Sequence, residues 1–309
     1  MNEAISLERA PVAERVRTGG MASPARSPRG LPATADRQVV VRGRRTARLG
    51  TALLVLAALA FALLLVLPIA AILARALAGA DALGAVGRPV VVEALRLSLL
   101  TTVLTLALTL AFGTPVAWLL ARREFPGRAW LDGLIELPMV LPPAVAGIGL
   151  LMAFGRRGLL GPLLASLGLT VGFTTAAVVL AQVFVAAPFY VRAAKVGFQG
   201  VDRELEEMAS TLGGSGWTIF WRVTVPLAFP SLLTGAAMCW ARALGEFGAT
   251  IMFAGSFQGR TQTMPLAIYA ALESDLEAAL ALSAILVVVS FGLLGLVRVM
   301  ARRSGLTEG

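Results

Sequence analysis

The stretch ELEEMASTLGGSGWTIFWRVTVP, residues 204–226, places a short acidic segment between two long apolar regions. Asp202 can cap a helix that starts here, and acidic residues suit the positive first turn of a helix. Apolar residues recur at i, i+3, i+4 and i+7, which predicts one apolar stripe. The stripe consists of Leu205, Met208, Ala209 and Leu212. Gly213 and Gly214 then predict the end of the helix.

The regions on both sides of this segment are apolar enough to cross a membrane several times. Of the 309 residues, 57% are hydrophobic and 15% are charged, whereas a soluble domain carries about 25% charged residues. We expect about six spans, each near the roughly 20 residues that cross a bilayer. Their expected bounds are Leu49–Ala74, Leu97–Ala121, Leu137–Gly155, Val171–Val191, Pro226–Ala254 and Ala278–Val297. The predicted fold class is therefore an all-α polytopic membrane protein.

Prolines distinguish the third expected span from the others. Pro138, Pro142 and Pro143 fall within or beside its apolar run. Proline removes a backbone donor and clashes with the preceding turn of a helix. The third span is therefore expected to bend or to be interrupted.

Basic residues indicate which side of the membrane each connection occupies. Ten arginines precede the first span, and further basic residues follow the second span, precede the fifth and follow the sixth. The opposite side carries only Arg75, Arg88, Arg96, Arg156, Arg157 and Arg260. Because positive residues favour the cytoplasm, both termini and residues 204–226 are expected to be cytoplasmic. The net charge of +9 is thus interpreted as topology and not as a sign of nucleic-acid binding.

The chain divides into a tail, a first span, a core and a short C-terminal end. Residues 1–48 are rich in Arg, Pro, Ala and Gly, which predicts a disordered basic cytoplasmic tail. Residues 49–92 contain the first span and an outer loop, 93–298 the core, and 299–309 a cytoplasmic end. The RRTARLG stretch before the first span faintly resembles a twin-arginine signal, but the apolar run exceeds the about 7–15 residues of a signal core. An uncleaved span is expected, and a cleaved signal is the alternative.

Several chemistries lack the residues that they require. The sequence has no histidine, one cysteine (Cys239) and one lysine (Lys195). A Cys/His metal site, an internal disulfide and a histidine general base are therefore excluded. Lys195 follows an alanine, so no Gly-Lys-[Ser/Thr] phosphate loop is present. If ATP drives this protein, a second chain must bind it.

With its cytoplasmic position inferred, the opening segment resembles the EAA motif of ABC importer permeases. That motif reads Glu-Ala-Ala, three residues, Gly, nine residues and Ile-x-Leu-Pro. The matching residues are Glu207, Ala209, Gly213 and Pro226. Met208, Val223 and Val225 depart from the motif but remain apolar. The resemblance implies a type I importer permease fold over residues 93–298.

The resemblance also implies what the segment does and with what it assembles. It would be a coupling helix that docks into a separate ABC ATPase subunit, through Glu206, Glu207, Met208, Ala209, Leu212 and Gly213. ATP and Mg would be bound by that subunit, with no cofactor on this chain. Further partners would be an external substrate-binding protein, a second copy of the chain and the lipid of a bacterial inner membrane. A simpler alternative is a helix that lies on the membrane or packs on its own chain.

The fifth expected span contains charges that are costly in a membrane. Arg242 and Glu246 are four residues apart and can pair on one helical face, and each charge costs about 2.5–3.5 kcal/mol at the bilayer centre. One hypothesis places them in the gate or translocation path, together with Gly245, Phe247 and Thr250. The alternative is a structural ion pair that locks this span to its neighbours.

Longer stretches resemble one branch of these permeases. ARALGEFGATIMFAG followed by GRTQTMPLAIY is most similar to molybdate permeases, and sulfate permeases share GEFGA. The resemblance implies import of molybdate, with tungstate allowed and sulfate as the alternative. A secondary transporter or channel would need coupling carboxylates or an inverted repeat, and a membrane enzyme would need a polar cluster. Glu246 is the only carboxylate within an expected span, so a secondary transporter and a membrane enzyme are both disfavoured.

Overall fold

The structure is a computed structural model that describes residues 34–78 and 87–303. Helix α1, Thr34–Ala78, contains the expected first span and begins before it. Of the tail that was expected to be disordered, residues 1–48, positions 1–33 lie outside the described residues, whereas positions 34–48 belong to helix α1. The chain separates into two compact units, Met1–Leu63 and Leu64–Gly309. The second unit contains the elements discussed below.

All regular structure between residues 87 and 303 is helical. The helices are α3 (Pro89–Arg122), α4 (Arg128–Val140), α5 (Pro143–Phe154), α6 (Gly161–Ser166), α7 (Thr175–Gln199), α8 (Arg203–Thr211), α9 (Gly216–Ile219), the π-helix η1 (Phe220–Thr224), α10 (Val225–Leu244), α11 (Gly248–Ala254), α12 (Met264–Ser274) and α13 (Leu276–Arg303). Within the described ranges, five helical stretches are long and apolar enough to span a membrane. Helices α4 and α5 form a sixth span if they are counted together. The predicted all-α class and six-span organisation are confirmed.

The third span is broken at its prolines, as predicted. Helices α4 and α5 meet at an angle of 119°. Helix α4 contains Pro138 and ends at Val140, and α5 begins with Pro143. The missing proline donors and the ring clashes explain why one continuous helix does not form here.

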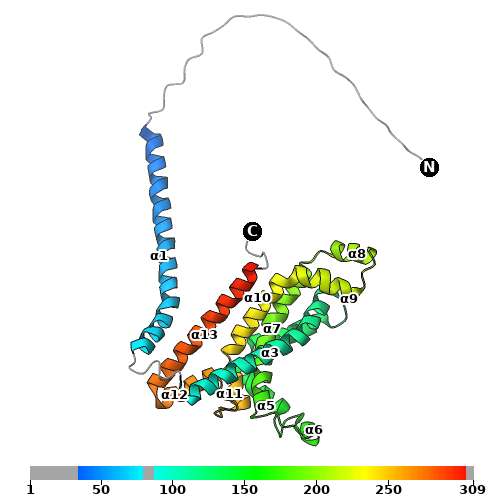
Figure 1. Cartoon of the computed structure of the whole chain (residues 1–309). Helices are drawn as coiled ribbons and strands as arrows, with labels where there is room; N and C mark the ends of the chain where they lie inside the picture. The colour runs from blue at the N-terminus through cyan, green and yellow to red at the C-terminus, as the bar shows by residue number, and fades with distance from the viewer. Residues whose placement is uncertain (1–33, 79–86, 304–309) are drawn as a thin grey trace, which may run out of the picture. The chain divides into compact units, whose positions relative to one another are not determined.

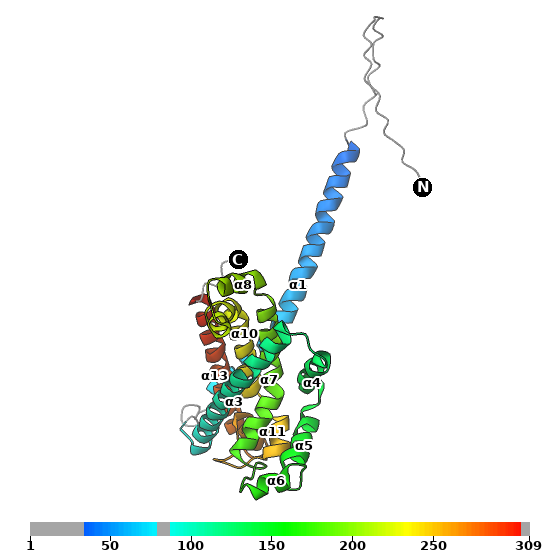
Figure 2. The same cartoon turned by 90° about the vertical axis from the view of Figure 1, so that its right-hand side faces the viewer.

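Helix α7 is the centre of the helical bundle. It packs against α3 and α10 (Figures 1 and 2), and Leu120, Tyr190 and Phe198 are buried where these helices meet. The backbones approach closely at Gly197, where a Cβ atom would lie 2.5 Å from the Cβ of Ser231. Small residues at such contacts allow close packing where lipid removes the hydrophobic drive for helix association.

Hydroxyl groups on one face of α3 add polar contacts inside the bundle. The buried members are Ser98, Thr101, Thr102, Thr105 and Thr109. The Ser98 hydroxyl accepts the Met264 N–H at 2.7 Å, and the Thr102 hydroxyl accepts the Trp240 indole N–H at 3.0 Å. These bonds satisfy polar groups at positions where water is excluded.

The fifth span differs from the prediction. It was expected to run from Pro226 to Ala254, but α10 ends at Leu244 and a separate helix, α11, starts at Gly248. At this break the Glu246 carboxylate accepts the Ala249 N–H at 2.8 Å. The bond satisfies one of the free backbone donors in the first turn of α11.

The ends of the bundle agree with the predicted orientation. Helix α8 and the C-terminal end of α13 lie at the same end, whereas α6 lies at the opposite end (Figures 1 and 2). Residues 204–226 and the end of α13, which were assigned to the cytoplasm, thus lie at one end of the bundle, and the α6 region, which was assigned to the outside, lies at the other. We refer to the α8 end as the cytoplasmic end.

Candidate functional site: the α8 segment and the α10–α11 junction

Local contacts define both ends of α8. The Asp202 carboxylate caps the helix by accepting the Glu204 N–H at 3.0 Å. Gly213 has a φ of 87°, in the left-handed region, and the Gly214 N–H donates to the Ala209 carbonyl at 3.0 Å. A left-handed residue just after the last turn is a common way for a helix to end, and it favours glycine. The predicted capped helix and glycine stop are both present.

Most of the apolar stripe of α8 is uncovered. Leu205, Met208 and Leu212 are 40%, 54% and 90% exposed. Glu207 is also exposed, whereas Ala209 is half-buried. We call Leu205, Glu207, Met208 and Leu212 the docking face. Exposed apolar side chains and an exposed carboxylate at the cytoplasmic end of the bundle are suited to contact another protein.

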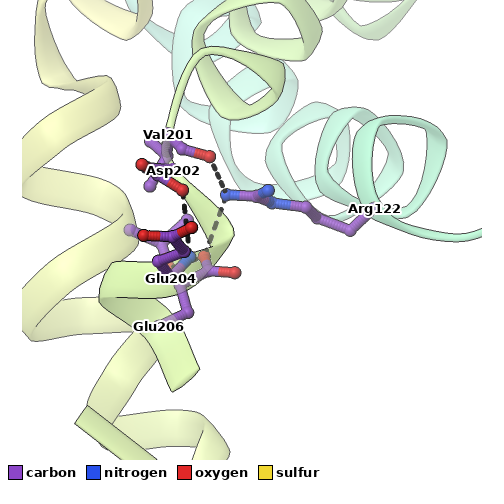
Figure 3. A network of polar contacts seen from close by, with 6 residues as sticks. Arg122, Val201, Asp202, Glu204 and Glu206 are labelled. Carbon is purple, nitrogen blue, oxygen red and sulfur yellow. Dashed lines mark hydrogen bonds and ion pairs between the residues drawn. The ribbon is translucent and has the colours of Figure 1, made fainter. Parts of the chain in front are cut away.

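Glu206 points into the chain and not toward solvent (Figure 3). Its Oε1 atom lies 3.0 Å from Nη2 of Arg122 and accepts the Thr224 hydroxyl at 2.6 Å. The same Nη2 donates to the Val201 carbonyl at 3.0 Å. The Arg122 and Glu206 side chains are 8% and 23% exposed. We call Arg122, Val201, Glu206 and Thr224 the clasp.

The sequence did not reveal the partners of Glu206. In the sequence, Arg122 is one of the basic residues that follow the second expected span, and Thr224 is not among the motif residues that the sequence indicates. Arg122 and Glu206 are 84 positions apart, so no local spacing connects them. The only signal was an arginine at the cytoplasmic end of one span and a glutamate in the cytoplasmic segment.

An aromatic group surrounds the π-helix that joins α9 to α10. The ring of Phe220 lies 6.1 Å from that of Trp118 on α3 and 6.1 Å from that of Phe198 on α7, measured between centroids. Trp217 and Trp221 contact the same ring. The start of α10 is thus packed against two neighbouring spans, and single π-helical turns often occur at functional positions.

The second candidate region is the junction between α10 and α11. Nη1 of Arg242 lies 2.8 Å from Oε2 of Glu246, which confirms the expected i,i+4 pair. The other oxygen of Glu246 caps α11 through Ala249. Glu246 is 1% exposed, so its charge is offset by one guanidinium and one backbone donor.

The other predicted path residues lie at this junction. Gly245 is exposed and follows the last residue of α10, and the Phe247 ring lies 5.3 Å from that of Tyr269. Thr250 is buried, and its hydroxyl has no hydrogen-bond partner among the described residues. All five predicted residues therefore lie at a break in the fifth span. No cluster of three potential metal ligands occurs in the part of the chain that the structure describes.

Comparison with known proteins gives concordant results. The family described as "Binding-protein-dependent transport system inner membrane component" matches residues 113–305. The molybdenum transport system permease protein ModB of Mycobacterium tuberculosis is 47% identical over 197 residues, which cover 64% of this chain and 75% of that protein. The sulfate transport system permease protein CysW of Synechococcus elongatus is 44% identical over 174 residues, which cover 56% and 61%.

A solved structure extends the similarity to the fold. It is a bacterial ABC transporter involved in the import of the acidic polysaccharide alginate, with a TM-score of 0.69 and 16% identity. The match covers 87% of this chain and 99% of that chain. At this identity the likeness concerns the fold alone. Together with the family match over most of the core, it shows that the chain belongs to the inner membrane components of binding-protein-dependent transport systems.

Proposed function

We propose that this chain is the permease subunit of an ABC importer that carries molybdate, and also tungstate, into the cytoplasm. The assignment of molybdate as the substrate rests on the 47% identity to a molybdenum permease over 75% of that protein's length. The stretches ARALGEFGATIMFAG and GRTQTMPLAIY support the same branch. A molybdate-binding protein on the outer side would deliver the anion, and two copies of the chain would enclose the path.

Sulfate is the second candidate substrate. It is favoured by the 44% identity to a sulfate permease, although that match covers a smaller part of the relative. Molybdate and sulfate are both tetrahedral dianions, so a path built for one can admit the other. Selection would then rest with the binding protein, since a strong anion site in the path would trap its ligand.

We assign the docking face of α8 to the contact with the ATPase subunit. The uncovered side chains of Leu205, Met208 and Leu212 support this role, because burying them against a partner is favourable. Glu207, about 100° around the helix from Met208, adds an exposed carboxylate that can pair with a basic group. Gly213 ends the helix and leaves room for a partner at its C-terminal end.

We assign the α10–α11 junction to the gate region, beside the translocation path. The support is a buried carboxylate, Glu246, that pairs with Arg242 at a helix break, since such breaks in membrane helices occur where the chain lines a cavity or is covered by protein. A purely structural lock is the alternative for Arg242 and Glu246. The Thr250 hydroxyl, which has no partner among the described residues, is a group that a passing oxyanion could use.

The test is ATP-dependent uptake into proteoliposomes that contain this chain, its ATPase and its binding protein. Labelled molybdate competes against tungstate and sulfate. Uptake that tungstate blocks and excess sulfate leaves unchanged is the expected result. Sulfate uptake with molybdate as a weak competitor would replace the substrate and keep the mechanism, and uptake without the ATPase would contradict the mechanism.

A further inference from the structure

We propose that the clasp is the rigid link that carries the movement of α8 into spans α3 and α10, and that Arg122 is the positioning residue of this link. The inference rests on the proposed function, in which α8 meets the ATPase. It adds that hydrolysis and transport are joined through one internal carboxylate, Glu206. The docking face itself is not part of the clasp.

Helix α8 has few other ties to the spans. It is nine residues long, and none of its residues is buried. Glycines follow it at positions 213, 214 and 216, which leaves a flexible connection to α9. A push on such a helix would be lost in bending of the connection unless a side-chain contact fixed the helix to the bundle. The clasp is such a contact.

The clasp joins three elements through a single atom. Arg122 is the last residue of α3, Thr224 is the last residue of η1, and α10 begins at the next residue. Both donate to Oε1 of Glu206. A displacement of α8 therefore acts directly on the cytoplasmic ends of two spans.

The surroundings make the contact strong. Arg122 is largely withdrawn from solvent, and its Nε has no partner among the described residues. Its guanidinium thus depends on Glu206 and on the Val201 carbonyl just before α8. A charged hydrogen bond in low dielectric is stronger than the same bond in water, so α8 is held in one position relative to α3.

Adjacent glutamates on α8 have different roles in this account. Consecutive residues on an α-helix project about 100° apart, and Glu206 faces the bundle whereas Glu207 is exposed. Glu207 belongs to the surface that meets the partner. Glu206 belongs to the link that transmits the movement, and the two can be tested separately.

The experiment measures transport per ATP hydrolysed in the full complex, reconstituted with the ATPase and the loaded binding protein. For Glu206→Gln we expect the ATPase to copurify normally. The ratio of transport to ATP hydrolysis should fall about tenfold, which is equivalent to about 1.4 kcal/mol. A loss of this size is typical of a lost charged hydrogen bond. Glu204→Gln is the matched control on the same helix, because Glu204 is exposed. It should keep the wild-type ratio.

A double-variant cycle tests whether Arg122 and Glu206 act as a unit. Arg122→Gln should lower the ratio as Glu206→Gln does, and the double variant should fall no further than the more affected single variant. If the two losses multiply, the residues act independently and the link is overturned. If Glu206→Gln fails to assemble, Thr224→Val decides, because it removes one neutral hydrogen bond. It should lower the ratio about threefold, and a wild-type ratio would overturn the link.

The failure of this inference differs from failure of the proposed function. If the wild-type complex does not accumulate an oxyanion with ATP, or the ATPase does not copurify, the proposed function fails and the inference with it. If the wild-type complex transports and Glu206→Gln transports with the same ratio, only the link is overturned. A normal amount of bound ATPase, together with a lowered ratio, is the result that supports it.

Discussion

The chain contains two arginine–glutamate ion pairs with similar N–O distances, but they connect different parts of the molecule. Arg122 and Glu206 lie 3.0 Å apart and connect a span to a cytoplasmic helix far away in sequence. Arg242 and Glu246 lie 2.8 Å apart and connect neighbouring residues across one break in a span. The first pair lies next to the exposed apolar side chains of α8. In the second pair Glu246 is buried and Arg242 is partly exposed.

Substitutions in the two regions should therefore have different effects. Changes near α8 should alter how the chain works with its partners, because little of α8 is buried against the bundle. Changes at the α10–α11 junction should alter how well the chain folds, because Glu246 is buried within a span and also satisfies the Ala249 N–H. The predictions below test this separation, from the largest expected effect to the smallest.

Charge reversal on the docking face should have the largest effect on transport. Glu207→Lys is expected to lower uptake by at least about 30-fold, because removing one partner of a docked charge pair costs about 2–5 kcal/mol and about 1.4 kcal/mol is a factor of ten. Gly213→Asp is expected to act in the same direction, since it places a side chain at a left-handed position. Both variants should insert in normal amounts by membrane fractionation. Normal uptake by both would disprove the docking assignment.

Removal of the Glu246 carboxylate should have the largest effect on stability. Glu246→Ala leaves Arg242 without its partner and α11 without its cap, which we expect to lower the free energy of unfolding by about 3 kcal/mol. Glu246→Gln keeps an acceptor for the Ala249 N–H and should lose roughly half as much. Thermal unfolding in detergent measures both. Equal losses would mean that the cap contributes nothing.

The close contact between α7 and α10 should tolerate no larger side chain. Gly197→Val is expected to cost about 1–3 kcal/mol through overpacking, because its Cβ would meet Ser231 at 2.5 Å. Ser231→Gly in the same chain should recover part of this loss. Gly200→Ala is the matched control, since the nearest atom to its Cβ is 3.5 Å away. A control as unstable as the valine variant would contradict the packing account.

Removing the charge of Asp275 should have the smallest effect on the melting temperature, and this effect should be present only above acid pH. Its pKa is lowered by the hydrogen bond from the Ala278 N–H and, to a smaller extent, by Arg88. A lowered pKa means that the charged form stabilises the fold above the ordinary pKa and that this contribution is lost as pH falls through the lowered value. Asp275→Asn keeps the cap but removes the charge. Its melting temperature should lie slightly below the wild-type value at pH 7 and match it in strong acid, and a larger gap in acid would contradict this.

Local features of the sequence predicted most of the fold. The spans follow from apolar runs, the bend between α4 and α5 follows from prolines, and the ends of α8 follow from Asp202 and Gly213. Each signal lies within a few residues of the structure that it determines. Comparison with relatives confirmed the family that the EAA-like spacing indicated.

The break in the fifth span and the clasp could not be predicted from local features of the sequence. Glu246 has two local roles, as partner of Arg242 and as cap of α11, and only the first was predicted. The second role lies at the break in the expected fifth span. The clasp could not be predicted, because its members come from three elements that meet only after the bundle has packed.

The most direct test of the central claim asks whether α8 touches the ATPase. In a Cys239→Ala background, a benzophenone probe is attached to a cysteine placed at Leu212, which is exposed at the cytoplasmic end. A matched probe is placed at Leu159, which is equally exposed near α6 at the opposite end. Irradiation of the assembled complex should crosslink the ATPase to position 212 and not to position 159. No crosslink from 212 in a complex that still hydrolyses ATP and transports would contradict the account.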